Sequence, residues 1–172
     1  ITLDQPSFGL SKEYLVEGEE HRLVKYYFEY MINSAVLLGA DEMVAKDQLK
    51  SALEFEISLS KISAPGKDRR DANKLYNPTT ISNMSNRGDP VHPPSWQDHF
   101  QTVLDVSIKS QEVHDGNLNT KRINIALDEK IIVKDPSFFA NISELIRNAK
   151  PKTIANYMAW RVVKSQMNNL ND

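Results

Sequence analysis

The sequence predicts a mainly α-helical protein that is interrupted by an irregular, proline-rich stretch and holds one short β-hairpin. Apolar residues recur at three- and four-residue steps over most of the chain, which is the period of a helix with one buried face. Alternation of apolar and polar residues, the period of a strand, is weak and limited to residues 121–135. No internal repeat, low-complexity tract or clean domain boundary is visible. The 172 residues are therefore expected to form one domain or part of a larger one.

The first two helices are predicted at residues 19–39 and 42–63, as an antiparallel pair. Two glutamates suit the positive N-terminal end of the first helix, and Gly39 suits its left-handed C-terminal stop. Asp41 can cap the second helix, and Pro65 followed by glycine ends it.

Beyond the second helix, residues 64–95 hold five of the eight prolines in the chain. Prolines at that density exclude long helices and central strands, but the apolar residues between them predict turns that dock on the protein. Three more helices are predicted, at residues 96–108, 137–149 and 152–170. Pro136 and Pro151 stand where the first residue of the last two helices is expected.

The composition excludes several classes of function. A net charge of −2 provides no basic surface for nucleic acid, so no nucleic-acid partner is expected. Zero cysteines exclude disulfides, thiol catalysis and cysteine-ligated zinc. No apolar run approaches the roughly 20 residues that span a bilayer, and no signal-peptide pattern is visible. Either the segment is soluble from the start or its targeting sequence lies upstream, and no direct membrane contact is expected.

No catalytic or metal-binding residue can be assigned from the spacing of polar groups. The four histidines, His21, His92, His99 and His114, lack the i, i+4 spacing that places two imidazoles on one helical face for zinc. Glu54 and Glu56 diverge on a helix, so a solvated face, or a buried Glu56 paired with a base, is expected instead of an acid–base pair. The charged cluster at residues 67–71 is read as an anion site or as a salt-bridge network.

Two kinds of short motif suggest surface roles. Arg87, Gly88 and Asp89 form the tripeptide that integrins recognise, in a segment expected to be an exposed loop. Asn83 and Asn141 begin Asn-x-Ser sequons and are candidate glycosylation sites in a secreted protein.

Four stretches, taken in order, resemble the neprilysin and endothelin-converting-enzyme family of zinc metallopeptidases. In the first stretch, "LDQPSFGLSKEYL", the matching residues are Asp4, Gln5, Gly9, Leu10 and Tyr14, whereas Ser11 stands where the family often has proline. In the second, they are Leu53, Glu54, Glu56, Ile62, Arg70, Asp71, Leu75, Tyr76, Asn77 and Thr80. The third holds Trp96 and Phe100, and the fourth holds Asn156, Tyr157, Trp160 and Arg161.

The resemblance implies that residues 1–172 are part of the helical covering lobe of a neprilysin-like zinc endopeptidase, which limits entry to short peptides. The zinc ligands and catalytic residues of such an enzyme have no counterpart here, so the zinc of the intact enzyme is not expected to bind this segment, and the segment alone is expected to be inactive. Its partners would be the rest of its own polypeptide, with short peptides as substrates. Leu3 to Leu15 would pack on the helices of this lobe and on parts outside the chain.

The sequence leaves alternatives open for the cellular location and for the function of the protein. The resemblance implies an extracellular or membrane-anchored ectodomain, although some bacterial relatives are intracellular. Two rival functions are a stand-alone binding or adhesion module that uses the Arg87–Asp89 loop and a catalytically dead homologue. A reading frame that continues into a His-Glu-x-x-His helix would favour the peptidase.

Overall fold

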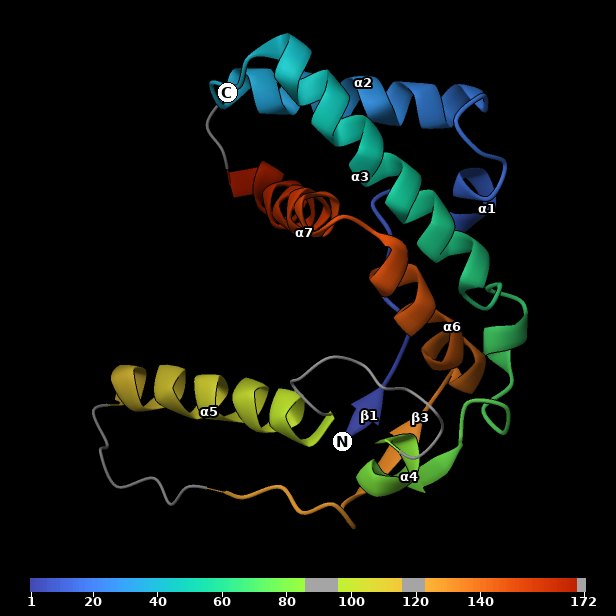
Figure 1. Ribbon diagram of the computed structural model, residues 1–172, viewed down its shortest axis with the longest axis vertical. Helices are drawn as coiled ribbons and strands as arrows, with labels where there is room; N and C mark the ends of the chain where they lie inside the picture. The colour runs from blue at the N-terminus through green and yellow to red at the C-terminus, as the bar shows by residue number, and fades with distance from the viewer. Residues whose placement is uncertain (86–95, 116–122, 170–172) are drawn as a thin grey trace. The chain divides into compact units, whose positions relative to one another are not determined.

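The computed structural model describes residues 1–85, 96–115 and 123–169 (Figure 1). The chain forms two compact units, each built from segments that are distant in sequence. One unit contains Ile1–Asp4 and Asp71–Pro136, and the other contains Gln5–Arg70 and Ser137–Asp172. The prediction of a mainly α fold is confirmed.

The second unit is helical. Its helices are α1 (Lys12–Leu15), α2 (Arg22–Leu37), α3 (Glu42–Ile62), α6 (Pro136–Asn148) and α7 (Pro151–Gln166), with short 3-10 turns at Asp68–Arg70 and Met167–Asn169. The helix α3 is central, because it contacts α1, α2 and α7. Its residues Phe55 to Ile57 are buried in succession, which requires neighbours on more than one face of the helix.

The ends of α2 and α3 follow the predicted signals. The side chain of Asp41 accepts a hydrogen bond from the backbone N–H of Val44, 3.0 Å away, and so caps α3. Gly39 has a φ of 95°, the left-handed conformation that ends α2 and that only glycine adopts without strain. In the first turn of α3 the side chain of Val44 is 52% exposed, whereas that of the next residue, Ala45, is buried.

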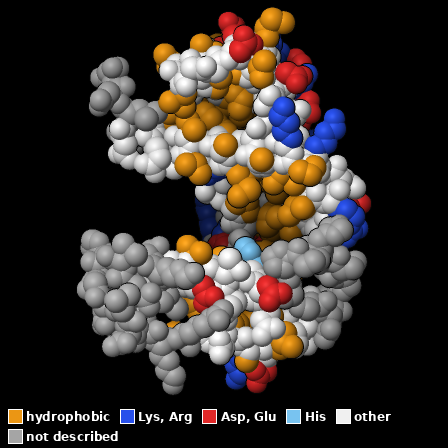
Figure 2. All heavy atoms as spheres, turned by 60° about the vertical axis from the view of Figure 1, so that its left-hand side comes forward, with side chains coloured by type: hydrophobic (Ala, Val, Ile, Leu, Met, Phe, Trp, Pro, Cys, Tyr) orange, Lys and Arg blue, Asp and Glu red, His pale blue; other side chains and the backbone are white. Residues whose placement is uncertain are grey.

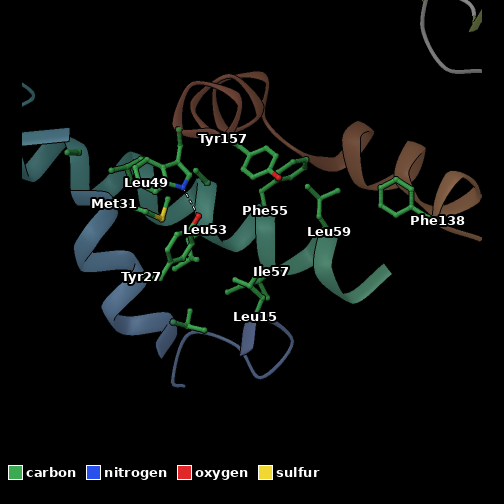
Figure 3. Close-up of a cluster of buried hydrophobic side chains, with 14 residues drawn as sticks. Leu15, Tyr27, Met31, Leu49, Leu53, Phe55, Ile57, Leu59, Phe138 and Tyr157 are labelled. Atoms are coloured by element: carbon green, nitrogen blue, oxygen red, sulfur yellow. Dashed lines mark hydrogen bonds between the residues drawn. The ribbon is translucent and has the colours of Figure 1, made fainter. Parts of the chain in front are cut away.

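The core of this unit is a cluster of apolar side chains from α1, α2, α3, α6 and α7 (Figure 3). Leu15, Met31, Leu53 and Phe138 are almost fully buried in it, and the ring of Tyr157 meets that of Phe55 edge to face, with centroids 5.3 Å apart. Leu15 belongs to the opening stretch, whose Phe8 and Leu10 also pack against the cluster. The prediction that this stretch packs on the helices is confirmed for these three residues.

The first unit contains a three-stranded sheet of order β1-β3-β2 and two helices, α4 (Ile81–Ser85) and α5 (Trp96–Asp115). The strand β1 (Thr2–Leu3) runs parallel to β3 (Lys130–Val133), and β2 (Pro78–Thr80) runs antiparallel to it. The short strand predicted within residues 121–135 therefore exists. It pairs with two segments distant in sequence instead of forming a hairpin.

Where the structure describes it, the proline-rich stretch holds short elements, namely the 3-10 turn at Asp68–Arg70, the strand β2 and the helix α4. Pro78 opens an edge strand, where a residue without an N–H can be accommodated. Ile81 and Met84 are buried, which agrees with the predicted docked turns. Residues 86–95 of this stretch lie outside the described residues.

The helix α5 is longer than predicted and holds a neighbouring extended segment through side-chain amides. The side chain of Gln101 donates to the carbonyl of Ile123 and accepts from the N–H of Ile125, both at 2.9 Å. Gln97 donates to the carbonyl of Ile125 at 2.7 Å. These amides satisfy backbone groups that no strand pairs.

Candidate functional site

The polar centre of the helical unit is the carboxylate of Glu56 on α3, whose side chain is 0% exposed. Its Oε1 accepts a hydrogen bond from the backbone N–H of Gly9 at 2.7 Å, and its Oε2 accepts one from the Tyr27 hydroxyl at 2.9 Å. The indole N–H of Trp160 donates to the same hydroxyl at 2.6 Å, drawn as a dashed line in Figure 3. The opening stretch, α2, α3 and α7 thus meet at one carboxylate.

The positive charge of Arg161 on α7 completes this network. Its guanidinium lies 3.2 Å from Oε1 of Glu56 and donates at 2.8 Å to the carbonyl of Ser7. A carboxylate removed from water is destabilising unless it is both paired and hydrogen-bonded, and here it is both. The sequence left two alternatives open, a solvated face or a buried Glu56 paired with a base, and the structure shows the second.

Gly9 lies so close to the network that no side chain fits there. A Cβ built on Gly9 would lie 1.8 Å from the hydroxyl oxygen of Tyr27 and 2.7 Å from its Cζ atom. Glycine at this position is therefore required by the close approach of the opening stretch to α2.

Two further contacts bind the opening stretch to the end of α3. The side-chain amide of Gln5 accepts from the N–H of Ala64 at 2.8 Å and donates to the carbonyl of Ala64 at 3.2 Å. The ammonium of Lys12 donates to the carbonyl of Ser63. The stretch is thus held by these polar contacts, by the buried side chain of Leu15 and by the partly buried side chains of Phe8 and Leu10.

Enclosed in this way, Glu56 has no route to a substrate. Both of its oxygens are engaged and its side chain has no accessible surface, so it cannot exchange a proton with a bound molecule. Among the residues that the structure describes, no three His, Cys, Asp or Glu side chains are grouped as metal ligands. The network can fix helices and backbone, and it offers no chemistry of its own.

Burial also changes the two tyrosines of this core. Removal from water, together with the nearby charge of Glu56, raises the pKa of Tyr157 to about 12. The same two causes raise the pKa of Tyr27 far above its ordinary value. Both hydroxyls therefore stay neutral well into the alkaline range.

The candidate modification sites that the structure describes lie on the surface of their units. Asn83 on α4 and Asn141 on α6 both have exposed side chains, and the Asn141 amide donates to the carbonyl of Ser137 at 2.8 Å. The residues Arg87, Gly88 and Asp89 lie outside the described residues.

Of the four histidines, His21 is a helix cap. Its Nδ1 accepts from the N–H of Leu23 at 3.2 Å at the start of α2, and its ring stacks on Tyr14. His99 is exposed on α5, beside the rings of Trp96 and Phe100. The charged cluster at residues 67–71 surrounds the short 3-10 turn at Asp68–Arg70.

Comparison with known proteins identifies the family. The chain matches the N-terminal model of peptidase family M13 over residues 1–172. The chain belongs to peptidase family M13. The M13 chain is 37% identical to Neprilysin-2 of Drosophila melanogaster, over 94% of this chain and 19% of that protein. It is 31% identical to an endothelin-converting enzyme homolog of Locusta migratoria, over 99% of this chain and 22% of that protein.

A human relative, membrane metallo-endopeptidase-like 1, is 26% identical over 99% of the M13 chain and 21% of its own length. The M13 chain thus spans about a fifth of the length of these relatives. No helix in its described part is both long and apolar enough to cross a membrane.

The structure brings together residues of three of the four stretches that carried the family resemblance. Gly9 comes from the first stretch, Glu56 from the second, and Trp160 and Arg161 from the fourth. Sequence reasoning missed the role of Tyr27, which bridges Glu56 and Trp160. Its only signal was a place on the inward face of α2.

Replacing Gly9 with alanine is expected to destabilise the protein by about 2 kcal/mol or more, because the new methyl group must displace the ring of Tyr27. Gly66→Ala is the matched control, since its Cβ would meet no atom closer than 3.8 Å. Urea unfolding followed by circular dichroism measures both variants. Equal stability of the two would contradict the close-approach argument.

Replacing Arg161 with methionine is expected to lower the free energy of unfolding by about 3 kcal/mol, because it leaves the Glu56 carboxylate buried without a positive partner. The double variant Glu56→Gln, Arg161→Met should recover part of this loss, since it removes the unpaired charge. A double variant less stable than Arg161→Met alone would show that the charge pair is not the cause.

High pH should destabilise the protein through its buried tyrosines. An unfolded tyrosine has a pKa of about 10, and the folded pKa of Tyr157 is raised to about 12. Its contribution is therefore complete below the unfolded pKa and is lost as the pH rises through the folded one. In urea unfolding measured between about pH 10 and pH 12, the free energy of unfolding should fall less steeply with pH in Tyr157→Phe than in the unaltered protein. Tyr76→Phe, whose ring is 63% exposed, should keep the original slope.

Proposed function

We propose that the chain is a substrate-gating, non-catalytic part of a zinc metalloendopeptidase that hydrolyses short peptides. Membership of peptidase family M13 over residues 1–172 carries this proposal. The names of the relatives, an endothelin-converting enzyme homolog and a metallo-endopeptidase-like protein, agree with peptide hydrolysis.

The chemistry is assigned to polypeptide outside these residues. A zinc peptidase needs metal ligands, a general base and a group that stabilises the oxyanion. The described residues group no set of metal ligands, and the buried carboxylate of Glu56 is sealed from substrate. We assign to this segment the role of shaping the space that a peptide must enter.

The physical support for gating is the way in which the helices are fixed. A lobe that excludes large substrates must not change conformation when it contacts them. The Glu56 network joins four segments through hydrogen bonds and an ion pair, and a fully satisfied buried network makes a structure rigid.

We further propose that the protein acts outside the cell or as a membrane-anchored ectodomain. The exposed position of Asn83 and Asn141 supports this location, because both asparagine side chains are open to modification.

The test uses the full-length polypeptide that contains this chain. It should hydrolyse short peptides, lose activity to a chelator and regain it with zinc, while residues 1–172 alone should bind no stoichiometric zinc and cleave no peptide. For gating, the ratio of kcat/KM for a short and a long peptide is compared between the unaltered enzyme and Arg161→Met, with Gly66→Ala as control. A ratio unchanged in Arg161→Met, at a temperature where it stays folded, would refute gating by this network.

Glycosylation tests the location. In material from a eukaryotic secretory pathway, mass spectrometry should find glycan on Asn141 or Asn83. The substitution Asn141→Gln should remove the glycan at position 141, and the protein should still fold. Native material in which both asparagines are bare would count against the extracellular assignment.

A further inference from the structure

The helix α7 has an uncovered face that lacks the charges of a solvent-facing helix. Four of its exposed residues, Ala155, Met158, Ala159 and Val162, follow the i, i+3, i+4, i+7 pattern of one helical stripe. The side chains of Met158 and Val162 are each 63% exposed. The stripe contains no charged residue.

The neighbouring helix α3 shows what a solvated face looks like in this protein. Its exposed residues include four charged ones in its middle turns, namely Lys46, Asp47, Lys50 and Glu54. On α7, in contrast, Arg161 turns to the buried Glu56. A helix that is apolar on opposite faces is typical of one buried on both.

Figure 2 shows hydrophobic side chains gathered at the surface in the upper part of the view, where α2, α3 and α7 lie. The two alanines of the α7 stripe would let the backbone of another helix approach closely. Met158 and Val162 would make apolar contacts with that helix.

We propose that this α7 stripe is a helix–helix interface, covered by an apolar helix of the same polypeptide that lies outside residues 1–172. The length of the relatives selects this occupant, because about four-fifths of each relative lies beyond the region that this chain matches. The inference rests on the proposal that the chain works as part of a longer peptidase.

Cysteine labelling in the full-length protein tests whether the stripe is covered. The segment has no cysteine of its own, so Met158→Cys introduces one thiol, and Glu54→Cys on α3 is the exposed control. Mass spectrometry follows maleimide labelling at each position, native and denatured. We expect position 158 to be protected at least about tenfold more than position 54. Equal rates, or protection that appears only at high protein concentration, would overturn the proposal.

A photo-crosslinking amino acid in place of Met158 identifies the occupant. The expected product is an intramolecular crosslink to a peptide outside residues 1–172. A crosslink between two copies, or to a peptide within residues 1–172, would overturn the proposal. Chelator-sensitive hydrolysis is measured on the same preparation. An inactive protein that gives the expected crosslink would refute the proposed function and leave the interface intact.

Discussion

The buried carboxylate of Glu56 is the constraint on which the helical unit depends. An ion taken out of water destabilises a protein by several kcal/mol unless its partners stand in place, and those partners come from three separate segments, the opening stretch, α2 and α7. An apolar residue at this position would avoid the free-energy cost of desolvating a charge, but it would tolerate small shifts of its neighbours. A buried carboxylate is stable only in the arrangement that brings the N–H of Gly9, the hydroxyl of Tyr27 and the guanidinium of Arg161 together.

Features encoded locally could be predicted from the sequence. Asp41 and Gly39 act within one turn of the helix that they bound, so a short window of sequence contains the whole cause. The sheet could not be predicted in this way. Its strand β1 has two residues and β2 has three, too few to show alternation, and both are stabilised by pairing with β3, which lies far along the chain.

The candidate site divides along the same line. Burial of Glu56 beside a base was one of the two alternatives that its helical spacing left open, and nothing local indicated that the base would be Arg161. Gly9, Glu56, Trp160 and Arg161 were recognised as parts of three separate family motifs. The structure gives a physical reason why these residues occur together, since each is hydrogen-bonded to Glu56 or to the Tyr27 hydroxyl that Glu56 holds.

The order of these partners along the chain has a consequence for synthesis on the ribosome. Glu56 and Arg161 are 105 residues apart, which at about 5–20 residues per second is an interval of about 5–20 seconds. During that time α2, α3 and the opening stretch can emerge, but their carboxylate still lacks its cation. The nascent unit must therefore stay open, with Glu56 in water, until α7 emerges, and its first half is exposed to chaperones and proteases for that period.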